Sequence, residues 1–217
     1  MSDSMGVLET TGWTPAIVAL DHMDKSAAIE VWQVELNDFL GTCVKITGST
    51  DAVRTALETG HCVAETMGGK PVSRLFPRLS DDAKPGVASK VEWNPLIQQN
   101  VVHEPNSVSS NSNPSPDSDT APEILSVTEI KALGFIETQG FTAVFQAVDT
   151  ACKTAQVEVV GKEKLGGGYV TIVIQGDVAA VRAAIDAATP AVEGLGTLIA
   201  AHVIARPSDA VRSLLPQ

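Results

Sequence analysis

Histidine, cysteine and glycine are the residue types in this sequence that could do chemistry. No histidine stands at metal-ligand spacing from another, no CxxC pair occurs, and no Ser-His-Asp or Cys-His order stands out. The residues concerned are His22, His61, His103, His202, Cys43, Cys62 and Cys152. We therefore expect no metal site, no cofactor and no catalytic centre. The odd number of cysteines suits reduced thiols in a cytoplasm.

A glycine-rich stretch over residues 161–168 is the other candidate for binding chemistry. It lacks the GK[ST] sequence and the following helix of a phosphate-binding loop. Apolar and β-branched residues flank it on both sides. The pattern instead predicts a turn at Gly166–Gly168 between strands over 157–164 and 169–175.

The elements that would position these residues occur twice. With a constant offset of 128 residues, Gly6 aligns with Gly134, and the register holds without a gap to Asp81 and Asp209. Two tandem copies of one domain, with no duplicated catalytic motif, point to assembly rather than catalysis.

The second copy shows the expected order of elements most clearly. Strands are predicted over 130–137, 157–164, 169–175 and 198–204, and helices over 143–155, from 178 until Pro190 interrupts, and over 208–215. Thr142 and Asp177 are the expected N-caps; in the first copy Thr14 is the cap and Pro15 takes the first helical position. This βαββαβ order predicts an α/β (α+β) fold of ferredoxin-like type, with helices on one face of an antiparallel sheet.

Between the copies the composition changes to serine, proline and asparagine. Such a polar segment cannot bury enough apolar surface to fold, so we expect disorder. The predicted division is a first domain over 1–97, a disordered linker over 98–123 and a second domain over 124–217.

The net charge of −11 excludes some partners. Both copies lack the basic field that nucleic acid or an anionic membrane would demand. The longest uncharged apolar run, 195–205, is too short to span a bilayer, and the amino terminus shows no signal peptide. We expect a soluble, cytoplasmic protein that binds neither nucleic acid nor membrane.

Three stretches of the second copy resemble the shell domain of bacterial microcompartments. Residues 133–140 (LGFIETQG) resemble its opening, 157–168 (VEVVGKEKLGGG) its second strand and pore loop, and 202–207 (HVIARP) its edge motif. The first copy is more diverged but keeps the register. Two fused, unpermuted domains resemble the tandem-domain class. The resemblance implies a homotrimer with six domains around one pore, which packs edge to edge with hexameric shell proteins.

The resemblance also implies pore residues in the loop after the second strand of each copy. They are Asn37, Asp38, Phe39, Leu40, Gly166, Gly167 and Gly168. Phe39 aligns with Gly167, so three phenylalanine rings could narrow the hole. Some tandem members hold an iron–sulfur cluster through a loop cysteine, but neither loop here has one. From the residues alone, the glycines could equally form a simple hairpin turn and Phe39 a core position.

Lys25, Lys153, Arg78 and Arg206 occupy the family's tile-edge positions. Long cationic side chains suit an interface where they lie along a neighbour and reach its carbonyl groups. The alternative for each lysine is a helical i,i+4 ion pair with Asp21 or Asp149.

These observations predict a structural shell protein, not an enzyme, which controls the passage of small metabolites through a pore. The alternative is a tandem ferredoxin-like regulatory module that binds a metabolite between the two copies and forms a discrete oligomer. A cofactor-dependent enzyme would need polar residues converging in a pocket, and the sequence indicates none.

Overall fold

The computed structural model describes residues 4–37, 40–105 and 130–215, which form two α+β domains and a segment between them. The first domain comprises β1 (Ser4–Thr11), α1 (Trp13–Ser26), β2 (Ile29–Asn37), β3 (Gly41–Gly48), α2 (Thr50–Thr66) and β4 (Val72–Phe76). The second comprises β8 (Ala132–Gln139), α4 (Phe141–Thr154), β9 (Val157–Gly166), β10 (Tyr169–Gly176), α5 (Val178–Ala188), the 3-10 turn η1 (Pro190–Val192), β11 (Thr197–Ala205) and α6 (Asp209–Ser213). The intervening elements are α3 (Lys84–Val87), β5 (Trp93–Asn94), β6 (Gln99–Asn100) and β7 (Val102–His103).

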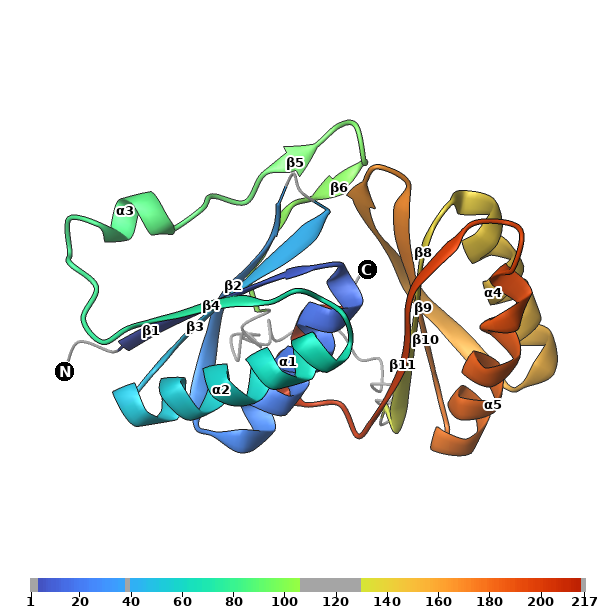
Figure 1. Ribbon diagram of the computed structural model, residues 1–217, viewed down its shortest axis with the longest axis horizontal. Coiled ribbons are helices and arrows are strands. Elements are labelled where there is room, and N and C mark those ends of the chain that lie inside the picture. The colour runs from blue at the N-terminus through green and yellow to red at the C-terminus, as the bar shows by residue number, and fades with distance from the viewer. Residues whose placement is uncertain (1–3, 38–39, 106–129, 216–217) are drawn as a thin grey trace, which may run out of the picture.

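The two sheets have the same antiparallel topology. Their strand orders are β4-β1-β3-β2 and β11-β8-β10-β9, and β7 extends the first sheet beyond β2. In each domain the two long helices pack on one face of the sheet (Figure 1). The predicted α+β fold with two tandem copies is therefore confirmed. Pro190 ends α5 and starts the 3-10 turn, as its missing amide proton requires.

A glycine at the same position in each domain lets a helix lie close against the sheet. A Cβ at Gly134 would lie 2.8 Å from Val181 Cγ1 of α5, and one at Gly6 would lie 2.7 Å from Val53 Cγ1 of α2. Distances this short leave no room for a methyl group. The aligned glycines therefore mark close helix–sheet packing in both copies.

The predicted starts of α1 and α4 were wrong by two residues, whereas Asp177 is the N-cap residue of α5 as predicted. Gly12 and Gly140 occupy the N-cap positions, and neither helix has a side-chain cap there. Thr14 is the second residue of α1 and Pro15 the third, where a proline is still tolerated because first-turn amides lack partners within the helix. The cap of α1 comes instead from the second domain, as described below.

The segment after β4 forms a strap, defined here as residues 84–105, along the face of the first sheet opposite α1 and α2 (Figure 1). The linker expected from residue 98 conflicts with this structure, because β6 and β7 occupy 99–103. Val102 is buried, and Leu36 donates a backbone hydrogen bond to the carbonyl of Val101 (2.8 Å). These apolar residues anchor the segment to β2. Positions 106–123 of the expected linker lie outside the described residues.

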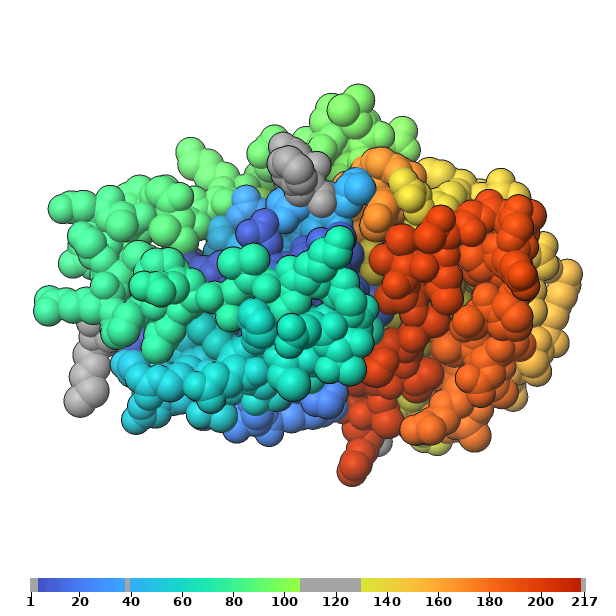
Figure 2. All heavy atoms as spheres, viewed as in Figure 1, coloured from blue at the N-terminus to red at the C-terminus, as the bar shows by residue number. Residues whose placement is uncertain are grey.

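The second domain turns the open face of its sheet toward the first domain. Helix α1 lies between its own sheet and strands β8 and β11 (Figure 1). Side chains of both domains form one buried cluster, which includes Trp13 and Ile17 from α1 and Phe135 and Ile204 from the second sheet. The space-filling view shows the two halves in close contact (Figure 2).

Candidate functional site

The two loops predicted to line a pore lie against each other. A Cβ at Gly167 would stand 2.7 Å from Leu40 Cδ2, so the leucine side chain fills the space that this glycine leaves. Of the predicted rim residues, Asp38 and Phe39 lie outside the described residues. Asn37, Leu40 and the three glycines are brought together at one end of the molecule.

The two loops share one backbone arrangement. Leu40 has a φ of 62°, and its aligned partner Gly168 has a φ of 83°. Gly12 donates a hydrogen bond to the carbonyl of Leu40, and Gly140 donates one to that of Gly168, both at 2.8 Å. Each loop is thus tied to the start of the first helix in its own domain.

Asn37 forms hydrogen bonds that stabilise the loop to which it belongs. Its Nδ2 donates to Glu9 Oε1 (2.6 Å), and its Oδ1 accepts from the amide of Gly41 (2.9 Å). These bonds fix the end of β2 relative to β1 and β3.

A buried carboxylate joins the domains near these loops. Glu137 of β8 accepts hydrogen bonds from the amides of Trp13 and Thr14, both at 2.9 Å, at the start of α1. A carboxylate is favoured at this place because first-turn amides lack intrahelical partners and the helix dipole is positive there. Burial raises the pKa of the Glu137 carboxyl, and the two backbone hydrogen bonds oppose that rise.

Two further contacts complete the domain interface. The rings of Trp13 and Phe135 lie 5.9 Å apart between centroids, and Asp21 Oδ1 accepts from the amide of Ser208 (2.8 Å). Burial lowers the pKa of His202 on β11, nearby His22 lowers it further, and Asp21 opposes both effects. Sequence reasoning missed this interface, because each residue reads as an ordinary part of its own domain.

Each residue of this interface has a counterpart at the 128-residue offset in the other copy. Several of these counterparts stay exposed in the single chain. Phe141 and Phe145 take the places of Trp13 and Ile17 on α4, yet 44% and 52% of their surfaces are exposed. On the first sheet, Glu9 takes the place of Glu137 and Phe76 that of Ile204, and both are exposed. The chain thus carries one closed contact and the two open halves of a similar one, in which Glu9 accepts a hydrogen bond only from Asn37 of its own domain among the contacts described above.

The predicted edge residues lie on the surface. Lys25 pairs with Asp21 and Lys153 with Asp149, each at 2.6 Å, so the helical ion pairs weighed above are present. Arg78 and Arg206 are exposed. The Lys153–Asp149 pair is exposed on both sides and contributes little to stability, whereas Asp21 in the other pair is buried.

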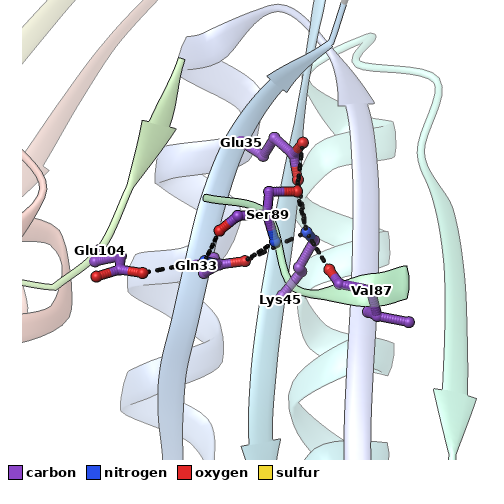
Figure 3. Close-up of polar contacts among 6 residues, drawn as sticks. All are labelled: Gln33, Glu35, Lys45, Val87, Ser89 and Glu104. Carbon is purple, nitrogen blue, oxygen red and sulfur yellow. Dashed lines mark hydrogen bonds and ion pairs between the residues drawn. The ribbon is translucent and has the colours of Figure 1, made fainter. Parts of the chain in front are cut away.

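A polar cluster that the sequence did not reveal holds the strap on the first sheet (Figure 3). Lys45 Nζ donates to Glu35 Oε2 (2.5 Å) and to the carbonyl of Val87 (2.8 Å), and Ser89 Oγ donates to Glu35 (2.8 Å). Gln33 donates to the carbonyl of Ser89 (2.7 Å). The signal that the sequence offered for this cluster was Lys45, a lysine within an otherwise uncharged strand.

The described residues offer neither a cluster of metal ligands nor a membrane-spanning helix. Within 4–37, 40–105 and 130–215, no three His, Cys, Asp or Glu side chains gather as metal ligands would. Burial raises the pKa of the Cys43 thiol to about 11, so this thiol is a poor nucleophile. None of the helices in this part of the chain is long and apolar enough to cross a bilayer.

Comparison with known proteins gives matches in both copies. The model of the BMC domain family matches residues 4–77 and 132–207. The chain is 47% identical over 87 residues to the bacterial microcompartment shell protein PduA of Citrobacter freundii, covering 40% of this chain and 94% of that protein. It is 45% identical over 87 residues to the major carboxysome shell protein CsoS1A of Halothiobacillus neapolitanus, covering 40% of this chain and 89% of that protein. A solved microcompartment protein from Desulfitobacterium hafniense is 23% identical, with a TM-score of 0.37, over 98% of this chain and 99% of that one.

Proposed function

The chain belongs to the bacterial microcompartment shell protein family, with two BMC domains in tandem, and from this premise we propose that three copies close into a tile with a central pore. The tile is a structural part of a shell in the cytoplasm, and small metabolites cross it through the pore. The division into two domains is part of this proposal, with the first domain extended through β7 (Val102–His103) and the second over 124–217 as predicted.

The observation that carries the proposal is that the interdomain contact forms once within the chain, while the surfaces for an equivalent contact remain exposed. Within the chain, Glu137 binds the start of α1 and buries Trp13. The start of α4 and the exposed Glu9 provide the same two parts for a contact between chains. A contact whose two halves are different surfaces of one molecule, here on its two domains, repeats head to tail and closes into a ring where the rotation allows. The family's six-domain arrangement then requires three chains.

The other parts of the interface also have counterparts. Ser80 and Asp149 correspond to the Ser208–Asp21 hydrogen bond, and both are exposed. Val72 is 66% exposed on β4, where its counterpart Ala200 on β11 is buried. Covering these apolar side chains on assembly would stabilise the ring by about 25 cal/mol per Å² of apolar surface removed from water.

The proposed pore forms only when the three chains assemble into the ring. The contact between Leu40 and Gly167 brings the two rim loops of one chain together, which supports a shared opening. Asn37, Asp38, Phe39, Leu40 and Gly166–Gly168 are the proposed rim. Alternating loops would give the pore threefold rather than sixfold chemistry. Lys25, Lys153, Arg78 and Arg206 are proposed to contact neighbouring hexameric tiles.

The test is the mass in solution, measured by light scattering after size exclusion. We expect about 68 kDa, three times the 22.7 kDa of one chain. The double variant Phe141→Asp, Phe145→Asp should give a folded monomer, because both rings are exposed in the single chain and two charges at an apolar contact oppose assembly.

Ala183→Asp is the matched control for this experiment. It adds a charge on α5 at a position that is exposed in both copies, since its counterpart Thr55 is exposed too. This variant should remain trimeric. A native chain that stays monomeric or dimeric at high concentration would exclude the ring, the pore and the edge contacts together.

A further inference from the structure

A small hairpin of the strap reaches from the first domain to the second. This bridging hairpin is defined here as residues 93–100, which include β5 and β6. The view in Figure 2 shows the corresponding green atoms at the top of the molecule, beside the second domain. In Figure 1 the hairpin lies next to the end of the β9–β10 hairpin. It therefore stands at the end of the molecule that carries the two loops.

One side chain fastens the hairpin to the second domain. Gln99 Oε1 accepts from the amide of Lys164 (3.0 Å), and Gln99 Nε2 donates to the carbonyl of Lys164 (2.8 Å) and to the buried carboxylate of Glu163. The amide group thus imitates a neighbouring strand on the free edge of β9. Lys164 lies two residues before the glycine turn at Gly166–Gly168.

The base of the hairpin is held separately, on the first domain. β7 pairs with β2, matching His103 with Val34, and the Lys45 cluster holds the preceding part of the strap (Figure 3). His103 Nε2 also lies 3.5 Å from Glu163 Oε1. Strand pairing between β7 and β2 fixes the base of the hairpin. The hydrogen bonds of Gln99 attach the rest of the hairpin to β9.

A cavity of about 470 Å³ lies between the hairpin and the two loops. Its lining includes Leu96 and Ile97 from the hairpin, Leu40 from the first loop, Gly166 and Gly167 from the second, and Phe141. The lining combines apolar side chains with the polar side chains of Asn37, Asn94 and Lys164 and the backbone of the glycine turn. A small, weakly polar molecule fits such a space.

We propose that the bridging hairpin is a lid over the pore loops and that Gln99 is its latch. With the latch closed, solutes reach the loops from the side, through the cavity, rather than along the axis. Opening the latch leaves the hairpin attached at β7 and exposes the loops. A hairpin with two-residue strands and a tip leucine that is 90% exposed has little stability of its own, so the Gln99 latch and the packing of Ile97 against the interdomain cluster hold it in place. This proposal rests on the proposed function, because the loops line a pore only in the ring.

The test uses a cysteine placed beneath the lid in the full-length chain. Leu40→Cys is combined with Cys62→Ser and Cys152→Ser, which remove the exposed thiols, while Cys43 stays unreactive at its raised pKa. The rate of reaction with a bulky maleimide is measured on the purified protein. Adding Gln99→Ala should raise this rate about five- to tenfold. This is the increase in the open population expected when roughly one net hydrogen-bond contribution is lost.

Asn100→Ala is the control, because Asn100 is exposed on the same strand. It should leave the rate unchanged. Hydrogen exchange gives a second readout: the Lys164 amide, which donates to Gln99, should exchange faster in Gln99→Ala and not in Asn100→Ala. If the thiol introduced by Leu40→Cys reacts in the latched chain as fast as a free thiol, the lid is overturned. An unchanged Lys164 amide in Gln99→Ala would overturn the latch.

The mass of the same samples separates the two proposals. The latch is a contact within one chain, so its hydrogen exchange is measurable whether or not the protein is a trimer. A monomeric mass with a Gln99-dependent Lys164 amide would overturn the ring and the covered pore but support the latch. A trimeric mass with no effect of Gln99→Ala on either readout would overturn the lid alone.

Discussion

At the scale of single residues, Glu137 links the two domains through the backbone of α1. Its two hydrogen bonds replace an N-cap that Gly12 has no side chain to provide. Burial of the carboxylate is unfavourable, as its raised pKa indicates. The carboxyl oxygens are needed at this place because two amides that lack intrahelical partners would otherwise be buried without acceptors.

His202 makes the stability of this interface depend on pH. Its pKa is lowered below 6.5, chiefly by burial, so the unfolded chain takes up this proton at a higher pH than the folded chain does. Stability should therefore fall as the pH drops from about 6.5 toward the lowered pKa. In denaturant unfolding, His202→Gln should remove this loss, which we expect to be below about 1.4 kcal/mol because the ring is half-exposed.

His61→Gln is the control for that measurement, since His61 lies on α2 and contacts Ser73 rather than the second domain. It should keep the pH dependence of the native chain. If His202→Gln loses as much stability on acidification below its unfolded pKa as the native chain does, the interface is not the source of the effect.

At the scale of elements, the repeat and the hydrophobic periodicity were sufficient to predict the strands, the long helices and their topology. The start of α1 was wrong because its cap lies 124 residues away, at Glu137, and no local pattern indicates it. The strap was missed because its strands are two residues long and gain their order from β2 and Lys45. Of the rim loops, the sequence predicted the turn at Gly166–Gly168; that they line a pore stays a prediction.

The close packing of helices on the sheets gives a prediction at this scale. Gly134→Ala and Gly6→Ala should each lower the free energy of unfolding by about 1–3 kcal/mol, because a methyl group overpacks the contact with Val181 or Val53. Denaturant unfolding measures this. Gly86→Ala, with no atom within 4 Å of the added methyl, should cost much less. Equal losses at all three positions would contradict the packing argument.

At the scale of the whole molecule, two equivalent contacts occur in different settings. One lies inside the chain and is closed, and the other is open on α4 and the first sheet. The two contacts have diverged: Trp13 meets Phe135 in the first, whereas Phe141 would meet Val7 in the second. The ring would therefore have threefold symmetry in detail.

Aligned substitutions should separate the two contacts. In the dilute monomer, Glu137→Ala should lower the free energy of unfolding by about 1–3 kcal/mol, because it leaves buried amides without acceptors. Glu9→Ala should change it by less than about 0.5 kcal/mol, because both Glu9 and its hydrogen bond to Asn37 are exposed to water. Sedimentation should instead show that Glu9→Ala weakens the trimer. Equal losses in the monomer, or a trimer unaffected by Glu9→Ala, would argue against the equivalence.

The fusion of the two domains in one chain also changes how assembly depends on protein concentration. Six separate domains would have to meet through six concentration-dependent contacts. Here the contact at Glu137 forms within one molecule, so it does not depend on protein concentration. In the proposed ring, half of the contacts would thus be made before any two chains collide. The proposed tile would therefore persist at low copy number, where a single-domain ring of equal contact strength would fall apart.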